Sequence, residues 1–172
     1  MKNILASVII ASALLIPAWA ADTTAKISGV HLCCKNCVTG VEKAVGEVQG
    51  LTVAVDKDAR TVTLTGPDAA TVQKGANALV AAGYFGKSSD ASVKVAVETG
   101  AKGKNVESLK VKGVHLCCPK CVTAVTEALT PVAGVKGNTA TKGAKSFEVT
   151  GDFNDKEVFT ALHKAGLAGK ME

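Results

Sequence analysis

Apolar and polar residues alternate in the first half of this chain in a pattern that predicts a β-hairpin. Residues 51–55 and 61–65 place apolar side chains at every second position, which is typical of half-buried strands. The charged run 56–60 between them is typical of a turn. Residues 25–30 form an earlier β-prone run, so we expect three strands in this half, and the hairpin supplies two of them.

Two helices are predicted around this hairpin. Between the first strand and the hairpin, valines recur at helical spacing, and Gly50 follows as a stop signal. These valines are Val38, Val41, Val45 and Val48. After the hairpin, Asp68 is positioned to cap a second helix, which Gly83 ends. Its core-facing residues are expected to be Val72, Ala76, Leu79 and Val80. The predicted order is βαββα.

The second half repeats this order with weaker strand signals. Its expected elements are a strand at 109–111, a helix at 122–129, strands at 135–140 and 146–150, and a helix at 156–165. A closing strand is harder to place. In the first half it falls at 84–87 or at 93–97, and in the second half only a very short edge within 167–172 is left for it.

An internal repeat organises the chain. The segment 29–39 (GVHLCCKNCVT) recurs as 113–123 (GVHLCCPKCVT), identical at nine of eleven positions and displaced by 84 residues. All six cysteines lie in these two segments. The chain is therefore expected to hold two copies of one domain, each with a single group of three cysteines.

Residues 1–20 are interpreted as a signal peptide. Lys2 precedes an apolar run from Ile4 to Ile16, and the segment ends in a small-residue cleavage site before Ala21. No later run is long and apolar enough to span a membrane. We therefore expect an exported product, periplasmic or secreted.

Composition and charge exclude several classes of function. The net charge is +5 and only 3% of residues are aromatic, so the chain lacks the basic stripe and stacking residues of a nucleic-acid-binding protein. No catalytic triad, phosphate-binding loop or zinc-protease helix is present. We expect neither nucleic-acid binding nor an enzymatic activity.

The cysteine spacing points to a soft metal ion. Two thiolates separated by two residues, where a loop enters a helix, can converge on one ion, and the helix N-terminus favours the anionic form. Cu(I) suits two or three thiolates, whereas zinc prefers four ligands. A Cys₃His zinc site is conceivable, but adjacent Cys33 and Cys34 are not expected both to point inward. Cu(I) is therefore favoured, with zinc or another thiophilic ion as the alternative.

Strand, cysteine loop, helix, hairpin and helix together resemble the heavy-metal-associated, copper-chaperone-like domain family. The residues that carry the resemblance are LCCKNC (32–37) and LCCPKC (116–121). The family pattern is M-x-C-x-x-C, so the resemblance implies a metal-binding pair in each copy, Cys34 with Cys37 and Cys118 with Cys121. Leu32 and Leu116 take the place of the buried Met, Cys33 and Cys117 fill the variable position, and His31 and His115 stand where Gly is common.

This resemblance implies an α+β fold, two tandem ferredoxin-like βαββαβ domains whose last strands are short. The expected domains are 22–97 and 106–172, with the Gly-rich run 98–105 as a linker. The implied metal ligands are Cys34, Cys37, Cys118 and Cys121, joined by Cys33 and Cys117, with His31 and His115 as possible additions. The implied partners are the metal ion and a metal transporter or another metal-binding protein.

Other interpretations of the cysteines stay open at this stage. The chain could be a thiol-disulfide redox protein, because CxxC at a helix start is also a redox geometry. It could be a disulfide-locked envelope protein, since export permits disulfides. Within the metal class, mercury and zinc are alternatives to copper, and delivery and sequestration are equally compatible. Tyr84 and Phe85 are expected to pack in the core or at the sheet edge, and His163 to lie at the surface.

Overall fold

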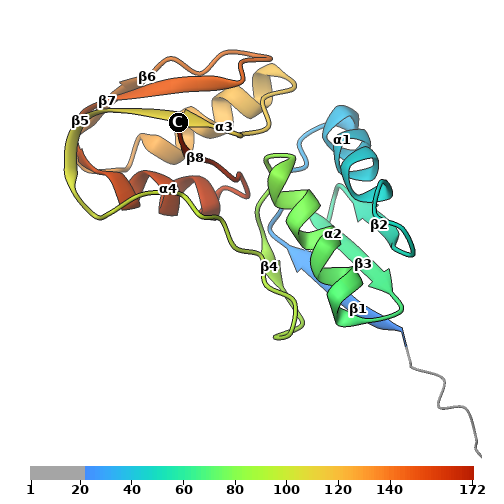
Figure 1. Cartoon of the computed structure of the whole chain (residues 1–172). Helices are drawn as coiled ribbons and strands as arrows, with labels where there is room; N and C mark the ends of the chain where they lie inside the picture. The colour runs from blue at the N-terminus through green and yellow to red at the C-terminus, as the bar shows by residue number, and fades with distance from the viewer. Residues whose placement is uncertain (1–21) are drawn as a thin grey trace, which may run out of the picture.

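The computed structural model describes residues 22–172, and the predicted signal peptide lies outside them. Two lobes lie side by side, the first built from the N-terminal repeat and the second from the C-terminal repeat (Figure 1). Among the described residues, no helix has the length and apolar character needed to cross a membrane.

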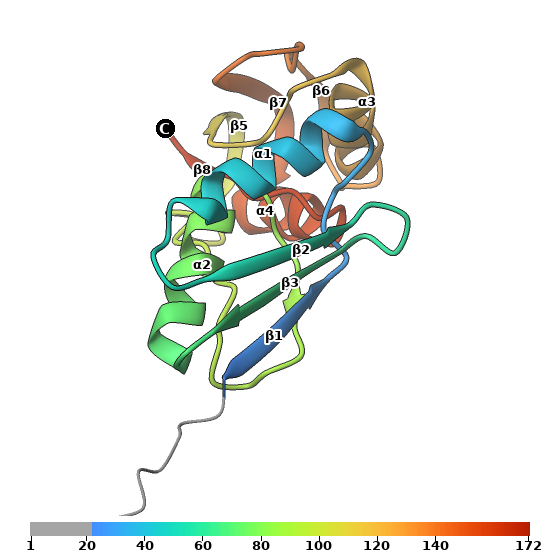
Figure 2. The ribbon, with the colours of Figure 1, turned by 90° about the vertical axis from the view of Figure 1, so that its right-hand side faces the viewer.

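The first repeat is a four-stranded antiparallel sheet with two helices. Its elements are β1 (Thr23–Ser28), α1 (Lys35–Gly46), β2 (Thr52–Asp56), β3 (Thr61–Gly66), α2 (Ala69–Ala81) and β4 (Lys87–Ser88). The strand order is β2-β3-β1-β4, and Figure 2 shows the first three side by side. This is the ferredoxin-like βαββαβ arrangement that the sequence predicts.

The second repeat has the same topology. Its elements are β5 (Asn105–Lys112), α3 (Pro119–Leu129), β6 (Val135–Asn138), β7 (Ser146–Asn154), α4 (Asp155–Lys164) and β8 (Lys170–Met171). The strand order β6-β7-β5-β8 matches that of the first sheet position by position. The α+β fold with two tandem ferredoxin-like units is confirmed, while the exact domain boundaries stay predictions.

Buried and exposed side chains alternate along the strands, so one face of each sheet packs against the helices. Along β1, Ala25 and Ile27 are fully buried while their neighbours are exposed, so one face of the sheet packs against helices α1 and α2. Helix α1 contributes Cys37, Val41 and Val45, four residues apart, to this core. Val41 and Val45 are buried as the valine spacing predicts, whereas Val38 is half-buried and Cys37 takes its place in the buried stripe.

The closing strands are two residues long in both repeats. Strand β4 pairs with β1 and β8 pairs with β5, each through two residue pairs. The alternative run 93–97 is not a strand, although Val93 is buried. Positive-φ glycines precede both strands: Gly83 (φ 93°) and Gly166 (φ 80°) turn the chain out of α2 and α4.

Candidate metal centre

Each cysteine motif lies where the first strand of a repeat passes into its first helix. Cys34 is the N-cap residue of α1 and Cys118 that of α3, and neither N-cap side chain bonds to the helix backbone. Cys37 and Cys121 lie in the first helical turn and are fully buried. Leu32 and Leu116, at the position of the family's buried Met, are each 4% exposed, as the resemblance implies.

The two motifs meet. The Sγ atom of Cys33 lies 3.5 Å from that of Cys118 and 3.6 Å from that of Cys121, so sulfur atoms of different repeats touch. Cys37 lies 3.6 Å from Cys117 and 3.9 Å from Cys121, and Cys34 lies 3.8 Å from Cys117. The sequence predicts one group of cysteines per domain, and it does not predict that the two groups form a single cluster.

Within each repeat the contacts are the same. Cys37 lies 3.6 Å from Cys33 and 3.7 Å from Cys34, and Cys121 lies 3.8 Å from Cys117 and 3.7 Å from Cys118. The expectation that adjacent cysteines diverge is thus wrong. The thiols of Cys33 and Cys34 both contact that of Cys37, with the N-cap residue Cys34 in an extended conformation, φ −157°.

Two glycine carbonyls join the repeats around this cluster. The Gly166 carbonyl accepts hydrogen bonds from the backbone N–H groups of His31 and Phe85, both in the first repeat. The Gly83 carbonyl accepts from those of His115 and Ala168, both in the second repeat. This exchange relates the two repeats by an approximate two-fold axis. Through these bonds His31 and His115, which directly precede the cysteine motifs, are each bound to the other repeat.

Aromatic side chains fill the contact between the repeats. Tyr84 is fully buried, donates a hydrogen bond from its hydroxyl to the Cys37 carbonyl (2.9 Å), and stacks on His115 at a ring-centre distance of 4.5 Å. Phe85 stacks on His163 at 4.0 Å. The expectation that His163 lies at the surface is therefore wrong, because Phe85 of the other repeat covers it, which the sequence of α4 alone cannot indicate.

The two motif histidines differ in their relation to the thiols. His31 lies with Cys33 and Cys121 in a group whose potential ligand atoms are all within 4.8 Å of one another. The Nε2 atoms of both His31 and His115 are buried without a hydrogen-bond partner. Burial lowers the pKa of His31, so its imidazole is neutral near pH 7 and has a lone pair to offer.

Ionisation of the thiols is coupled through the cluster. The contact between the Cys37 and Cys121 thiols lowers the pKa of Cys37 and raises that of Cys121. Burial raises the pKa of Cys33 and raises that of Cys117 to about 12. Burial also opposes ionisation of Cys118, but the nearby backbone N–H of Cys121 and the neighbouring thiols lower the pKa of Cys118 to about 7.

This arrangement offers thiolates and neutral thiols together in a partly buried site. Thiolates are the form that binds soft ions, and an entering cation displaces the remaining protons. All six cysteines are free of disulfides. The predicted ligands Cys33, Cys34, Cys37, Cys117, Cys118 and Cys121 are therefore brought together, while their role as ligands stays a prediction.

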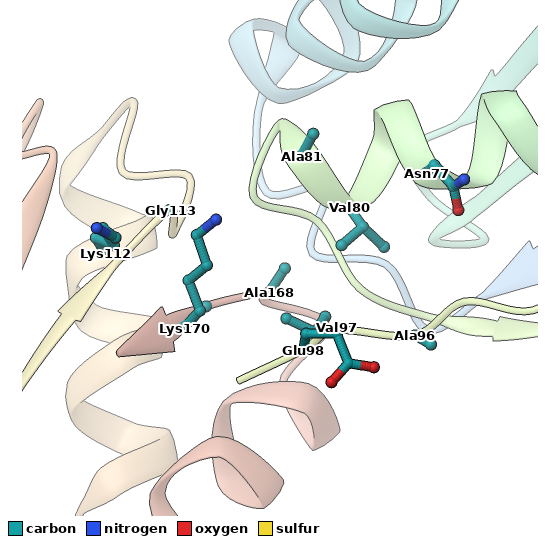
Figure 3. A pocket seen from close by; sticks show the side chains of 11 residues that line it. Asn77, Val80, Ala81, Ala96, Val97, Glu98, Lys112, Gly113, Ala168 and Lys170 are labelled. Atoms are coloured by element: carbon teal, nitrogen blue, oxygen red, sulfur yellow. The ribbon is translucent and has the colours of Figure 1, made fainter. Parts of the chain in front are cut away.

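Two cavities lie along the contact between the repeats. One, of about 580 Å³, has Cys33 and His31 in its lining together with Arg60 and Lys164, so it reaches the edge of the cluster. The other, of about 330 Å³, is lined by Val80 and other residues of α2, by segment 96–98 and by 168–170 (Figure 3). None of the six cysteines lines this second cavity, which is separate from the metal centre.

Comparison with known proteins finds periplasmic metal-transport components that are similar to this chain. No protein-family model matches it. It is 40% identical over 86 residues to the periplasmic component of mercuric transport from Pseudomonas aeruginosa, and equally to that from Serratia marcescens. Each match covers 93% of the relative and 49% of this chain, which is about the length of one repeat.

Among solved structures, the N-terminal soluble domains of Bacillus subtilis CopA align with 89% of this chain and 95% of theirs. The TM-score is 0.34 and the sequence identity 15%.

Proposed function

The chain belongs to the heavy-metal-associated domain family, with the periplasmic mercuric transport components as relatives, and from this we propose that it is an exported carrier of soft metal ions. The proposal includes no catalytic step. The observation that carries it is the convergence of six free thiols, with Sγ–Sγ distances of 3.5–3.9 Å, at one place in the fold.

The sulfur spacing bears on how many thiolates hold one ion. With metal–sulfur bonds of about 2.3 Å, sulfur atoms lie about 3.8 Å apart in tetrahedral, about 4.0 Å in trigonal and about 4.6 Å in linear coordination. The distances between neighbouring thiols, 3.5–3.9 Å, favour three or four thiolates per ion. Such all-sulfur coordination selects Cu(I) or Zn(II), and Cu(I) accepts the three-coordinate case.

Hg(II) is the second candidate, favoured by the names of the two relatives, both mercuric transport components. It is a soft ion that binds thiolates, so the same cysteines would hold it. The relatives are also periplasmic components, which supports the proposed export of this chain to the periplasm.

Transfer to a partner requires a route to the ion. The cavity of about 580 Å³ beside Cys33 supplies one, because its openness to solvent lets the thiolate of a second metal-binding protein or transporter approach. We propose that transfer proceeds by ligand exchange, in which the incoming thiolate replaces one cysteine of the cluster at a time. Sequestration would use the same site without this exchange.

The test is an anaerobic titration of the reduced mature protein with Cu(I), and separately with Hg(II), against a competing chelator. We expect tight binding in the wild-type protein and a loss of affinity of at least about tenfold in Cys34→Ser and Cys118→Ser. Thr39→Ser, an exposed change in the same helix α1, is the matched control and should bind like the wild type.

Either of two results would contradict the proposal. One is affinity no greater than that of small-molecule thiols for both ions. The other is a protein isolated from the periplasm with its cysteines paired in disulfides and with dithiol turnover that depends on the first cysteine of each CxxC pair. That second result would identify the thiol-disulfide redox alternative instead.

A further inference from the structure

The potential ligands of the cluster fall into overlapping groups of three. Four such groups have all their ligand atoms within 4.8 Å of one another. They are His31–Cys33–Cys121, Cys33–Cys34–Cys118, Cys34–Cys37–Cys117 and Cys117–Cys118–Cys121. Three of the four groups combine residues of both repeats, so the grouping belongs to the whole chain and not to one motif.

Sharing of the thiols is systematic in these groups. Every cysteine except Cys37 belongs to two groups, and His31 supplies the remaining ligand position. A thiolate sulfur has several lone pairs and can bridge two ions. Four three-coordinate ions, one per group, would therefore use the cluster completely, with five bridging thiolates and two terminal ligands.

We propose that the chain assembles a single thiolate-bridged cluster of up to four Cu(I) ions across its two repeats, in place of one ion in each motif. This inference rests on the proposed soft-metal function and specifies its site. It assigns ligand roles to Cys33 and Cys117, outside the CxxC pairs, because they make the shortest Sγ–Sγ contacts between repeats, 3.5 Å from Cys33 to Cys118 and 3.6 Å from Cys117 to Cys37.

Charge favours a monovalent ion for such a cluster. Six thiolates carry six negative charges, and four Cu(I) ions reduce the net charge to −2. The N-termini of α1 and α3 lie at the cluster, because Cys34 and Cys118 are their N-cap residues, and they favour this residual negative charge. Binding releases one proton for each thiol that is still protonated, and neither copper nor sulfur changes oxidation state.

The contact between the repeats is required for this cluster. Gly166 packs so closely that an added Cβ would lie 2.2 Å from the Gly29 carbonyl oxygen and 2.5 Å from the His31 nitrogen. A side chain at this position must push the repeats apart. Gly29 has nearly the same backbone conformation, φ 78° against 80°, and an added Cβ there meets nothing within 4 Å. The pair provides a matched test.

The first experiment measures copper stoichiometry by native mass spectrometry of the full mature chain loaded anaerobically with Cu(I), with X-ray absorption to detect copper–copper scattering. We expect a dominant species with more than two and up to four ions, filled without a stable one-ion form, and a clear copper–copper signal. Cys33→Ser and Cys117→Ser should each lower the number of bound ions while leaving both CxxC pairs intact.

The second experiment compares Gly166→Ala with Gly29→Ala, after circular dichroism has shown that both variants are folded. Gly166→Ala should fall to at most one ion per motif and lose the copper–copper signal, whereas Gly29→Ala should keep the full cluster. Both variants retain all six cysteines, so a difference between them reports the contact between the repeats.

Two ions filling independently, without copper–copper scattering and without effect of Cys33→Ser or Cys117→Ser, would overturn the shared cluster and leave the soft-metal function standing. The absence of any tight Cu(I) or Hg(II) binding would overturn both. Equal stoichiometry in Gly166→Ala and Gly29→Ala would also contradict a site that needs both repeats.

Discussion

Tyr84 links the core of the first repeat to the metal centre through one hydrogen bond and one stacked ring. The sequence places this residue, the only tyrosine, before the closing strand, and the expectation that it packs in the core is confirmed by its zero exposure. Its bond to the Cys37 carbonyl was not predicted, because the partner lies 47 residues away in sequence. Tyr84 and Cys37 meet only because α1 packs against the segment that follows α2, where Tyr84 lies.

Removal of this hydroxyl is expected to weaken folding. In Tyr84→Phe the ring still fills its site and stacks on His115, but the buried bond to the Cys37 carbonyl is lost. We expect the free energy of unfolding to fall by about 1 kcal/mol, measured by urea denaturation of the reduced protein. Thr24→Val, which removes an exposed bond to Thr65, is the control and should change it by less than about 0.5 kcal/mol. Equal effects of the two variants would argue against a buried bond.

At the scale of elements, the helices follow local rules that the sequence displays. Asp68 caps α2 as predicted, since its carboxylate accepts a hydrogen bond from the Thr71 backbone N–H. Two predicted core valines behave differently: Val80 is only half-buried, and Val48 lies beyond the end of α1 at Gly46. Periodicity therefore predicts the buried face of each helix, but the tertiary contacts decide which individual residues on that face are fully buried.

The run 98–105, predicted as a linker, is bound near its C-terminal end to the first residue of α4. The buried Asp155 carboxylate accepts hydrogen bonds from the backbone N–H groups of Lys102, Gly103 and Lys104. Burial by itself raises the pKa of Asp155, but these donors outweigh it and leave that pKa below its usual value.

This anchor predicts a pH-dependent contribution to stability. Because the folded-state pKa of Asp155 is lowered, its contribution is present above the unfolded value, near 4, and is lost as pH falls through the folded value. Asp155→Ala should lower the free energy of unfolding at pH 7 by roughly 1.5–3 kcal/mol and reduce the loss of stability between pH 5 and pH 2.5. Urea denaturation at these pH values measures both.

Asp152→Asn is the control for this change, because it removes an exposed carboxylate near the end of β7, just before α4. It should leave the pH profile of stability close to that of the wild type. An Asp155→Ala profile that parallels the wild type down to pH 2.5 would show that the three N–H groups do not stabilise the ionised form.

At the scale of the whole molecule, the two repeats act as one unit because their contacts are reciprocal. The Gly83 and Gly166 carbonyls each accept two backbone hydrogen bonds from the other repeat, and Tyr84 forms an isolated β-bridge with Leu167. Phe85 covers His163 on the same side. Each repeat thus buries part of the other and supplies hydrogen-bond partners for its backbone.

The stacked His163 is expected to make this contact sensitive to acid. Burial lowers the pKa of His163, so the folded state holds it neutral. Its contribution to stability is present above the unfolded pKa of about 6.5 and is lost as pH falls from there through the folded value. Between pH 7.5 and 5 the wild type should lose more stability than His163→Phe, which keeps a ring against Phe85 and cannot titrate.

Urea denaturation of the reduced, metal-free protein measures this difference, with Tyr84 fluorescence as the probe of the contact. His163→Gln, which removes the titrating ring and the stack together, should be less stable than the wild type at both pH values. Identical pH profiles for the wild type and His163→Phe would show that His163 does not contribute.

The sequence by itself determined the repeat, the order of strands and helices, the cap of α2 by Asp68 and the cysteines that gather at each first helix. These depend on local periodicity, capping and spacing, which neighbouring residues establish. The positions of Tyr84, His163 and Asp155, and above all the meeting of Cys33 with Cys118, depend on contacts between residues 47 to 85 positions apart. Only the tertiary structure decided them, because packing and hydrogen bonding between distant segments, within and between the repeats, set those distances, and no local pattern encodes them.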